Sequence, residues 1–174
     1  MTPEALVALA NLGRPRRPAG TSVARGEPIL PDLAGASGQL AGLLDRPVTE
    51  PDLAGLRGVH HAAARAAEAI LAGEPVDCAE LNALAADSTA RIELVVTDGT
   101  PSQRLTWDDA TPASALARRL ITELSALDPA RLRRCAREQC DLLFYDTTRS
   151  RTRRWHAEDP CGWRERQHTH RTRR

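Results

Sequence analysis

Lysine is missing from the sequence: all 24 basic residues are arginine. Without a lysine amine the chain cannot form a Schiff base with a carbonyl substrate, and it lacks the lysine of a Walker-type phosphate loop. Two classes of enzyme chemistry are therefore excluded. Arginine, by contrast, is the side chain best suited to paired hydrogen bonds with phosphate groups. Recognition of a polyanion stays open.

The sequence also has no apolar run long enough to cross a membrane. The longest apolar stretch near its start covers residues 5–10, whereas a spanning helix needs about 20 residues. No basic residue precedes this stretch, as one would in a signal peptide. We therefore expect a cytoplasmic protein without a membrane partner. In that compartment, cysteines serve metal or redox chemistry more often than structural disulfides.

Aromatic side chains are scarce, at 3 % of the 174 residues. Four of the five lie close together in the sequence: Phe144, Tyr145, Trp155 and Trp163. Charge is distributed just as unevenly. Residues 1–130 contain 11 Arg and 17 acidic residues, a net charge of −6, whereas residues 131–174 contain 13 Arg and 6 acidic residues, a net charge of +7. The composition therefore divides the chain near residue 130.

Abundant alanine and leucine favour a mainly helical protein. Apolar spacing, together with capping and breaking residues, predicts helices over 2–12, 32–45, 51–72 and 112–127, and a short helix that begins near Asp77. β-Branched residues on both sides of Asp98-Gly99 predict a hairpin near 91–107. We expect a mainly α fold with one β-hairpin. A helical domain would cover 1–130, and a small domain ending in a helix would cover 131–174.

Three further expectations concern the helical domain. The Pro- and Gly-rich stretch 13–29 predicts an exposed loop whose arginines lie in solvent: Arg14, Arg16 and Arg17. His60 and His61 are adjacent on a predicted helix, so they point about 100° apart and cannot chelate one ion together. We expect both on the polar face of that helix. Cys78 stands close to two leucines in the sequence, which predicts a buried thiol.

Three cysteines and a histidine in the C-terminal segment have the spacing of a metal site. Their pattern is Cys-x4-Cys-x15-His-x4-Cys. Zinc prefers four thiolate or imidazole ligands in a tetrahedron, and small domains usually supply them as two pairs joined by a loop. The alternative is three unrelated thiols and a surface histidine. The paired spacing favours a zinc knuckle with one structural Zn²⁺ bound by Cys135, Cys140, His156 and Cys161.

Arginine and hydroxyl residues fill the stretch between the two ligand pairs and continue beyond the second pair. These are the side chains that contact phosphate oxygens in protein–DNA complexes. On a helix from about residue 161, Arg164, His168 and Arg171 lie on one face. We therefore expect contact with double-stranded DNA through Arg149, Arg151, Arg153, Arg154, Arg164 and Arg171.

The C-terminal segment resembles the bacterial CGNR-type zinc finger, which typically follows an N-terminal ABATE domain. The resemblance covers 131–174 and rests on residues that match in order and spacing: Arg134-Cys135, Cys140, Leu143-Phe144, Asp146, Arg153-Arg154-Trp155, and Cys161-Gly162 with Arg164. A looser match over 1–130 rests on the opening Leu-Val-Ala-Leu-Ala-Asn-Leu helix and the order of helices and hairpin. The resemblance implies a DNA-binding bacterial transcription regulator whose N-terminal domain senses stress, with a small-molecule effector as a candidate partner.

The segment departs from the family pattern at two positions. His156 stands where the family usually has cysteine, a conservative change because imidazole binds zinc well. Trp163 replaces the asparagine of the Cys-Gly-Asn-Arg motif. Any hydrogen bond that depends on that asparagine is therefore missing.

Two other functions compete with DNA-binding regulation. A zinc domain for protein interaction would have no salt-dependent affinity for nucleic acid. A zinc-stapled nuclease would need a general base, for which His168 or His170 could be nominated, but the sequence contains no second cluster of metal-binding carboxylates. We therefore expect a binding protein and not an enzyme. The pattern specifies neither an operator nor an oligomeric state.

Overall fold

The structure, a computed structural model, describes residues 2–14, 35–44, 46–109 and 111–172. A bundle of helices forms its body: α1 (Glu4–Asn11), α2 (Ser37–Leu44), α3 (Glu50–Ala72), α4 (Ala79–Ala85) and α5 (Pro112–Ser125). A long hairpin, β1 (Ser88–Thr97) and β2 (Thr100–Asp109), connects α4 to α5. The predicted mainly α fold with a hairpin is confirmed. None of the helices in the described part of the chain is both long and apolar enough to cross a bilayer.

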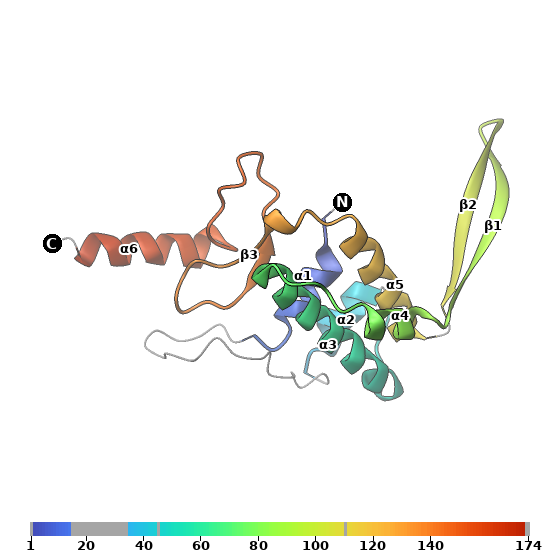
Figure 1. The fold of residues 1–174 in the computed structure, drawn as a ribbon, viewed down its shortest axis with the longest axis horizontal. Helices are drawn as coiled ribbons and strands as arrows, with labels where there is room; N and C mark the ends of the chain where they lie inside the picture. Colours follow the sequence, from blue (N-terminus) through green and yellow to red (C-terminus); the bar gives the residue numbers. More distant parts are fainter. Residues whose placement is uncertain (1, 15–34, 45, 110, 173–174) are drawn as a thin grey trace.

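The remaining elements form the C-terminal segment. A short 3₁₀ turn (Pro129–Arg131) leads into strand β3 (Leu132–Arg134), which pairs antiparallel with β4 (Leu143–Tyr145). A long loop follows β4, and a single π turn, η2 (Glu158–Gly162), begins the C-terminal helix α6 (Trp163–Thr172). The hairpin β1–β2 and α6 project from opposite ends of the molecule (Figure 1).

The helix boundaries follow from local chemistry. The Asp52 carboxylate accepts hydrogen bonds from the backbone N–H and hydroxyl of Thr49, which caps the start of α3. Helix α3 ends at Gly73, whose φ of 72° suits glycine best. Thr111 caps α5 by accepting from the Ser114 N–H at 3.0 Å. The capping residues in the sequence therefore begin and end the long helices as predicted.

The core lies where α1, α3 and α5 meet. Its largest members are leucines from all three helices: Leu6, Leu9, Leu56, Leu116 and Leu120. Small residues bring α3 and α5 close together, because a Cβ added at Gly55 would lie only 2.9 Å from the Cβ of Ala113. The alanine-rich face of α3 is thus the surface on which the other helices pack.

Strands β3 and β4 extend this core into the C-terminal segment. Leu132 and Leu143 are buried in the same hydrophobic cluster as the helices. The side chain of Asn11 forms two hydrogen bonds with the backbone of Leu143, donating to its carbonyl at 2.9 Å and accepting from its N–H at 2.7 Å. The C-terminal segment is therefore packed on the end of α1 and not merely tethered to it.

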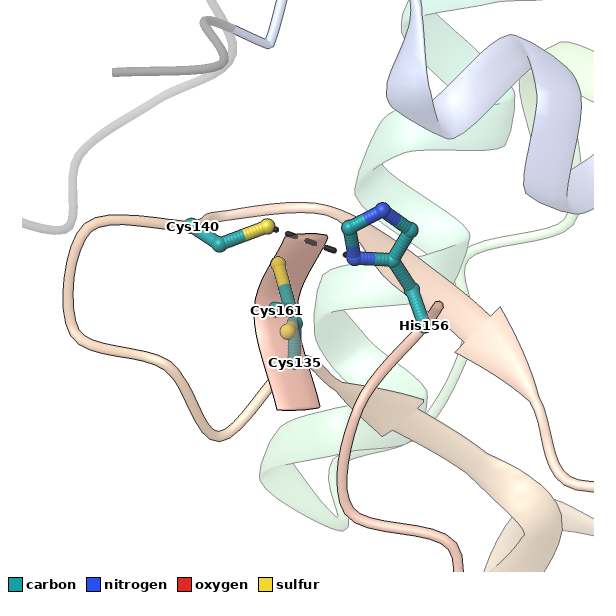
Figure 2. Close-up of side chains that lie close together, drawn as sticks. All are labelled: Cys135, Cys140, His156 and Cys161. Carbon is teal, nitrogen blue, oxygen red and sulfur yellow. Dashed lines mark hydrogen bonds between the residues drawn. The ribbon is translucent and has the colours of Figure 1, made fainter. Parts of the chain in front are cut away.

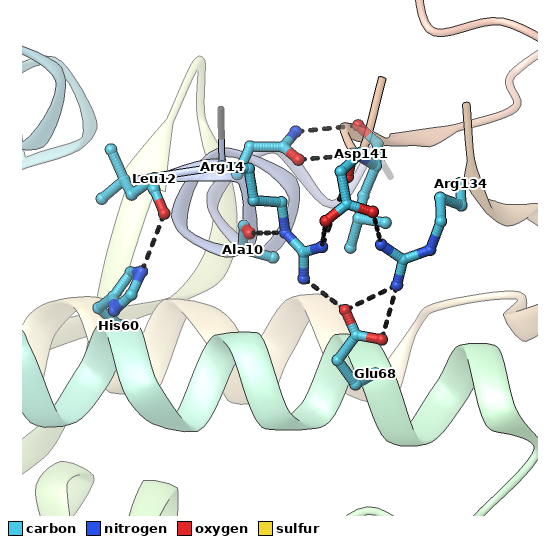
Figure 3. Close-up of polar contacts among 9 residues, drawn as sticks. Ala10, Leu12, Arg14, His60, Glu68, Arg134 and Asp141 are labelled. Atoms are coloured by element: carbon cyan, nitrogen blue, oxygen red, sulfur yellow. Dashed lines mark hydrogen bonds and ion pairs between the residues drawn. The ribbon is translucent and has the colours of Figure 1, made fainter. Parts of the chain in front are cut away.

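An ion-pair network spans the same junction (Figure 3). Glu68 of α3 accepts from Arg14 and from Arg134, and Asp141 pairs with the same two arginines. Arg14 also donates to the carbonyl of Ala10, and its side chain is almost fully buried. Arginine suits this position because one guanidinium donates to several acceptors at once.

Three expectations from the sequence are wrong. Arg14 is buried because it bridges α1, α3 and the segment before β4. His60 is fully buried, with its Nε2 3.3 Å from the carbonyl of Leu12, whereas His61 is on the surface beside Glu80. Cys78 is exposed, because it precedes α4 and does not point into the core. Arg16 and Arg17 lie outside the described residues.

Burial of His60 predicts a pH dependence of stability. Loss of solvent lowers the pKa of His60 below its ordinary 6.5. Below about that pH the unfolded chain binds a proton at this histidine, whereas the folded chain keeps it neutral. Folding stability should be constant above about pH 6.5 and decrease below it, by at most about 1.4 kcal/mol per pH unit from this group.

Urea unfolding of the zinc-loaded protein between pH 5.5 and 7.5 measures this slope. His60→Gln should flatten the profile, whereas His61→Gln on the surface of the same helix should leave it unchanged. Equal slopes for the wild-type protein and His60→Gln would contradict the assignment.

Candidate metal centre

The predicted ligands converge on one point. The ligand atoms of Cys135, Cys140, His156 and Cys161 all lie within 4.8 Å of one another (Figure 2). The three cysteines are buried and the histidine is half-buried. For tetrahedral zinc with Zn–S bonds of about 2.3 Å, sulfur atoms are expected about 3.8 Å apart. The spacing and the donor types therefore fit one zinc ion.

The first pair of ligands comes from the turn between β3 and β4. The N–H of Cys135 donates to the carbonyl of Leu142 at 2.9 Å, which continues the strand pairing by one residue. The N–H of Cys140 donates to the carbonyl of Arg137 at 2.9 Å and closes the turn. The four residues between the cysteines thus form a knuckle that turns both thiols toward the same side.

The second pair is held against this knuckle by the backbone. The Ala136 N–H donates to the carbonyl of Arg154 at 2.8 Å, which brings the end of the long loop beside the first ligand. His156 then places its Nδ1 3.4 Å from the sulfur of Cys140. Figure 2 shows the imidazole ring on the opposite side of the sulfur atoms from the knuckle backbone.

Cys161 completes the set from the π turn η2. Its neighbour Gly162 approaches Glu158 so closely that an added Cβ would lie 2.6 Å from a carboxylate oxygen. The Glu158 carboxylate in turn pairs with Arg166 of α6. The last ligand, Cys161, therefore lies in the turn from which the C-terminal helix α6 starts.

The three buried thiols shift one another's pKa values. A hydrogen bond from Cys140 lowers the pKa of Cys135 to about 4. The same hydrogen bond raises the pKa of Cys140. Burial raises the pKa of Cys161. Three buried thiolates repel one another unless a cation lies between them, and a divalent ion with a thiolate preference supplies that charge.

The four protein side chains would fill all four positions of a tetrahedral zinc ion and leave none for water or substrate. That arrangement is typical of a structural zinc ion, whereas catalytic zinc keeps one position open. The donor set therefore supports a role for the metal in holding the fold together.

Arg153 and Asp146 support the site, and sequence reasoning missed both roles. Arg153 donates to the carbonyls of Trp155 and His156 and lies 5.1 Å from the centre of the Phe144 ring. The fully buried Asp146 accepts from the N–H and hydroxyl of Thr148 and from the N–H of Arg153. Hydrogen bonds from Thr148 keep the pKa of Asp146 below its ordinary value. The Asp-x-Thr spacing, typical of a side-chain-closed turn, was the available signal.

The other arginines expected to contact DNA differ in their surroundings. Arg149, Arg154 and Arg164 are exposed, and Arg154 lies against the Trp155 ring at 5.4 Å. Arg151 is exposed but pairs with Asp128 at 3.2 Å. The side chain of Arg171 lies outside the described part of the structure.

We expect purified protein to contain one equivalent of zinc by elemental analysis. Cys135→Ser/Cys161→Ser should lose the metal, because two of four ligands are gone. His156→Cys should retain it, because thiolate binds zinc as well as imidazole does. Removal of zinc by a chelator should speed amide exchange across 135–162 and leave α3 and α5 protected.

Cys78→Ser is the matched control, because Cys78 is exposed and outside the cluster. It should keep a full equivalent of zinc. Full zinc content in the double cysteine variant would contradict the assignment of the site.

Comparison with known proteins agrees with this geometry. The sequence profile of the CGNR zinc finger family matches residues 131–174. No curated protein matches the chain. The C-terminal segment is thus similar to a CGNR zinc finger, and its four clustered cysteine and histidine side chains can hold one zinc ion.

Proposed function

We propose that this protein is a zinc-dependent DNA-binding transcriptional regulator. In this proposal residues 131–174 contact double-stranded DNA and the helical body regulates that contact. The observation that carries it is the position of the metal ligands. His156 ends the arginine-rich loop and Cys161 lies in the turn into α6, so one zinc ion would fix both arginine-bearing elements.

The arginine-rich loop supplies phosphate-binding groups. Residues 149–152 are all exposed, and they alternate arginine with a hydroxyl residue: Arg149, Ser150, Arg151 and Thr152. Arg154 is exposed beside them. Asp146 and Arg153 hold the loop from inside, which reduces the entropy lost when it binds a rigid polyanion. This arrangement favours contact with the DNA backbone.

Helix α6 supplies the element that fits a major groove. It projects from the body (Figure 1), and a single helix has the width that the groove accepts. Arg164 is exposed on its first turn, and arginine is the side chain that most often reads guanine in the major groove. Trp163, 53 % exposed, precedes it in place of the asparagine of the family motif. A flat aromatic ring at that position favours stacking or sugar contact over hydrogen bonding to a base edge.

Internal pairing reduces the number of arginines available to phosphate. Arg134 pairs with Glu68 and Asp141, Arg151 pairs with Asp128, and Arg153 binds backbone carbonyls. Among the described side chains, this leaves Arg149, Arg154 and Arg164 exposed for phosphate. Arg171, expected from the sequence, would add a fourth contact. Four contacts predict a slope of log affinity against log salt of about −3.6 on duplex DNA.

An apolar pocket in the helical body suits a regulatory ligand. It lies between α3, α4 and α5, has a volume of about 350 Å³, and is lined mainly by Ile70, Leu81, Ile121, Leu124, Leu127 and Pro129. Its chemistry favours a small apolar effector. Asp128 lies between two of the lining residues and pairs with Arg151 and Arg131. An effector in this pocket would act on the arginine-rich loop through that residue.

The salt series provides the main test. Fluorescence anisotropy of labelled duplex DNA with the zinc-loaded full chain should give a slope near the value above. Arg149→Gln/Arg154→Gln should reduce the slope by about 2 units, because two phosphate contacts are lost. Arg57→Gln/Arg104→Gln, which changes two exposed arginines of the body and hairpin, should have no effect.

Three outcomes would contradict the proposal. An affinity that does not depend on salt would favour the protein-interaction function. Cleavage of plasmid DNA with added divalent ions would favour the nuclease. Equal weakening by both double variants would mean that net charge, and not this loop, attracts the DNA.

The effector pocket has its own test, because Cys78 lies at its rim and is exposed. A bulky maleimide on Cys78 should block the pocket and lower the fluorescence of bound anilinonaphthalene sulfonate. Zinc protects the other cysteines from the reagent. Cys78→Ser treated in the same way should keep its fluorescence. Unchanged fluorescence after complete labelling would contradict a ligand site in this pocket.

A further inference from the structure

The β1–β2 hairpin exposes large apolar side chains. Ile92, Leu94 and Val96 of β1 are 70 %, 79 % and 66 % exposed, and Leu105 and Trp107 of β2 are 48 % and 41 % exposed. Single exposed apolar residues are common, but a contiguous group of this size marks an interaction surface. The exposure means that the described part of the chain leaves this surface open.

The strand register places all five side chains on one face. Ile92 is opposite Leu105, and the neighbouring pairs on the same face are Ala90 with Trp107, Leu94 with Gln103, and Val96 with Pro101. We call these eight residues the apolar face. None of them ionises. Four charged residues of the strands lie on the other face: Arg91, Glu93, Arg104 and Asp108. Asp109, opposite Ser88 at the base of the hairpin, lies beside the apolar face and is paired with Arg118.

The hairpin does not need this face for its own local structure. The turn at Asp98-Gly99 has φ values of 51° and 77°, the left-handed pair that a tight two-residue hairpin loop requires. Among the described residues, the hairpin contacts the body mainly through α5, and its strands project outward (Figure 1). A lone two-stranded hairpin is marginally stable in water. Covering the apolar face would therefore stabilise it.

We propose that a second copy of this chain covers the apolar face, with two hairpins stacked face to face about a two-fold axis. An isologous dimer needs a surface that complements itself. The eight residues of this face carry no charge, and the two charged groups at its base, Asp109 and Arg118, are paired with each other. Two copies therefore bring no unpaired like charges together. The side chains of this face are bulky near the base, at Trp107, and smaller near the tip, at Val96 and Pro101. Antiparallel stacking sets each base against the other's tip.

The Trp107 ring is held in place by neighbouring side chains, which suits it as an anchor for this contact. The guanidinium of Arg118 lies 4.7 Å from the centre of its ring, and Arg118 is itself held by two hydrogen bonds to Asp109, at 3.0 and 2.7 Å. The ring is thus fixed before association, so little side-chain entropy is lost on binding. Tryptophan in such a setting is the most frequent type of interface hot spot.

The area agrees with a dimer of moderate affinity. Two ten-residue strands measure about 34 Å by 10 Å. Burying the rough surface of one such face on each copy removes on the order of 1,000 Å² from water, near the lower limit for a specific interface. Dissociation in the micromolar range is therefore expected.

Sedimentation equilibrium of the zinc-loaded full chain tests the proposal. The wild-type protein should reach twice its 18.9 kDa mass at micromolar concentrations. Ile92→Thr/Leu94→Thr should raise the dissociation constant at least about 100-fold, because four apolar side chains per dimer become polar while strand propensity is kept. Val95→Thr makes the same kind of change on the opposite face and should leave association unchanged.

A second measurement needs no variant. Amide exchange of the wild-type protein should slow across 88–109 as protein concentration rises, and stay constant in α3. Each of three results would overturn the proposal. The wild-type protein could be a monomer at all concentrations, the double variant could leave the dimer intact, or amide exchange in the hairpin could be independent of concentration. Loss of association with Val95→Thr as well would also overturn it.

Discussion

The convergence of four metal ligands from separated stretches of chain organises the C-terminal quarter of this protein. Cys135 and Cys140 come from the β3–β4 turn, His156 from the long loop and Cys161 from the turn into α6. These stretches bury few apolar side chains besides the cysteines themselves. Small metal-binding segments depend on the ion because they have too little core to fold on hydrophobic burial alone. The loop and α6 can hold a fixed relation only while the ligands meet.

That metal centre is not isolated from the helical body. Leu132 and Leu143 belong to the body's core, Asn11 binds the backbone of β4, and Glu68 pairs with Arg134 directly before the first ligand. A buried ion pair is weak evidence for stability in itself, because desolvation offsets its attraction. Its geometry is nevertheless specific. The junction therefore fixes the orientation of the zinc segment on α1 and α3.

The two projecting ends of the molecule have opposite chemistry. One end carries the arginine-rich loop and α6, and the other carries the uncharged face of the hairpin. In our proposals a polyanion would bind the first, and a second copy of the chain would cover the apolar face of the second. The proposed functions thus occupy separate surfaces, so DNA contact and self-association do not compete for the same residues. Between them, the pocket beside Asp128 offers a position from which a ligand could act on the loop.

The sequence by itself determined the elements whose causes are local. The helix starts at Thr49 and Thr111 are capped by hydrogen bonds to residues three positions along, Asp52 and Ser114. Asp98-Gly99 makes a hairpin because both residues tolerate positive φ. The four zinc ligands could also be identified from the sequence, because zinc sites constrain the spacing of the residues that bind the ion. Only the tertiary structure determined whether Arg14, His60 and Cys78 are buried or exposed. It alone also showed that Arg153 and Asp146 support the metal site. Those outcomes depend on partners that are distant in the sequence, such as Glu68 for Arg14. Local sequence patterns do not specify which distant segments pack together.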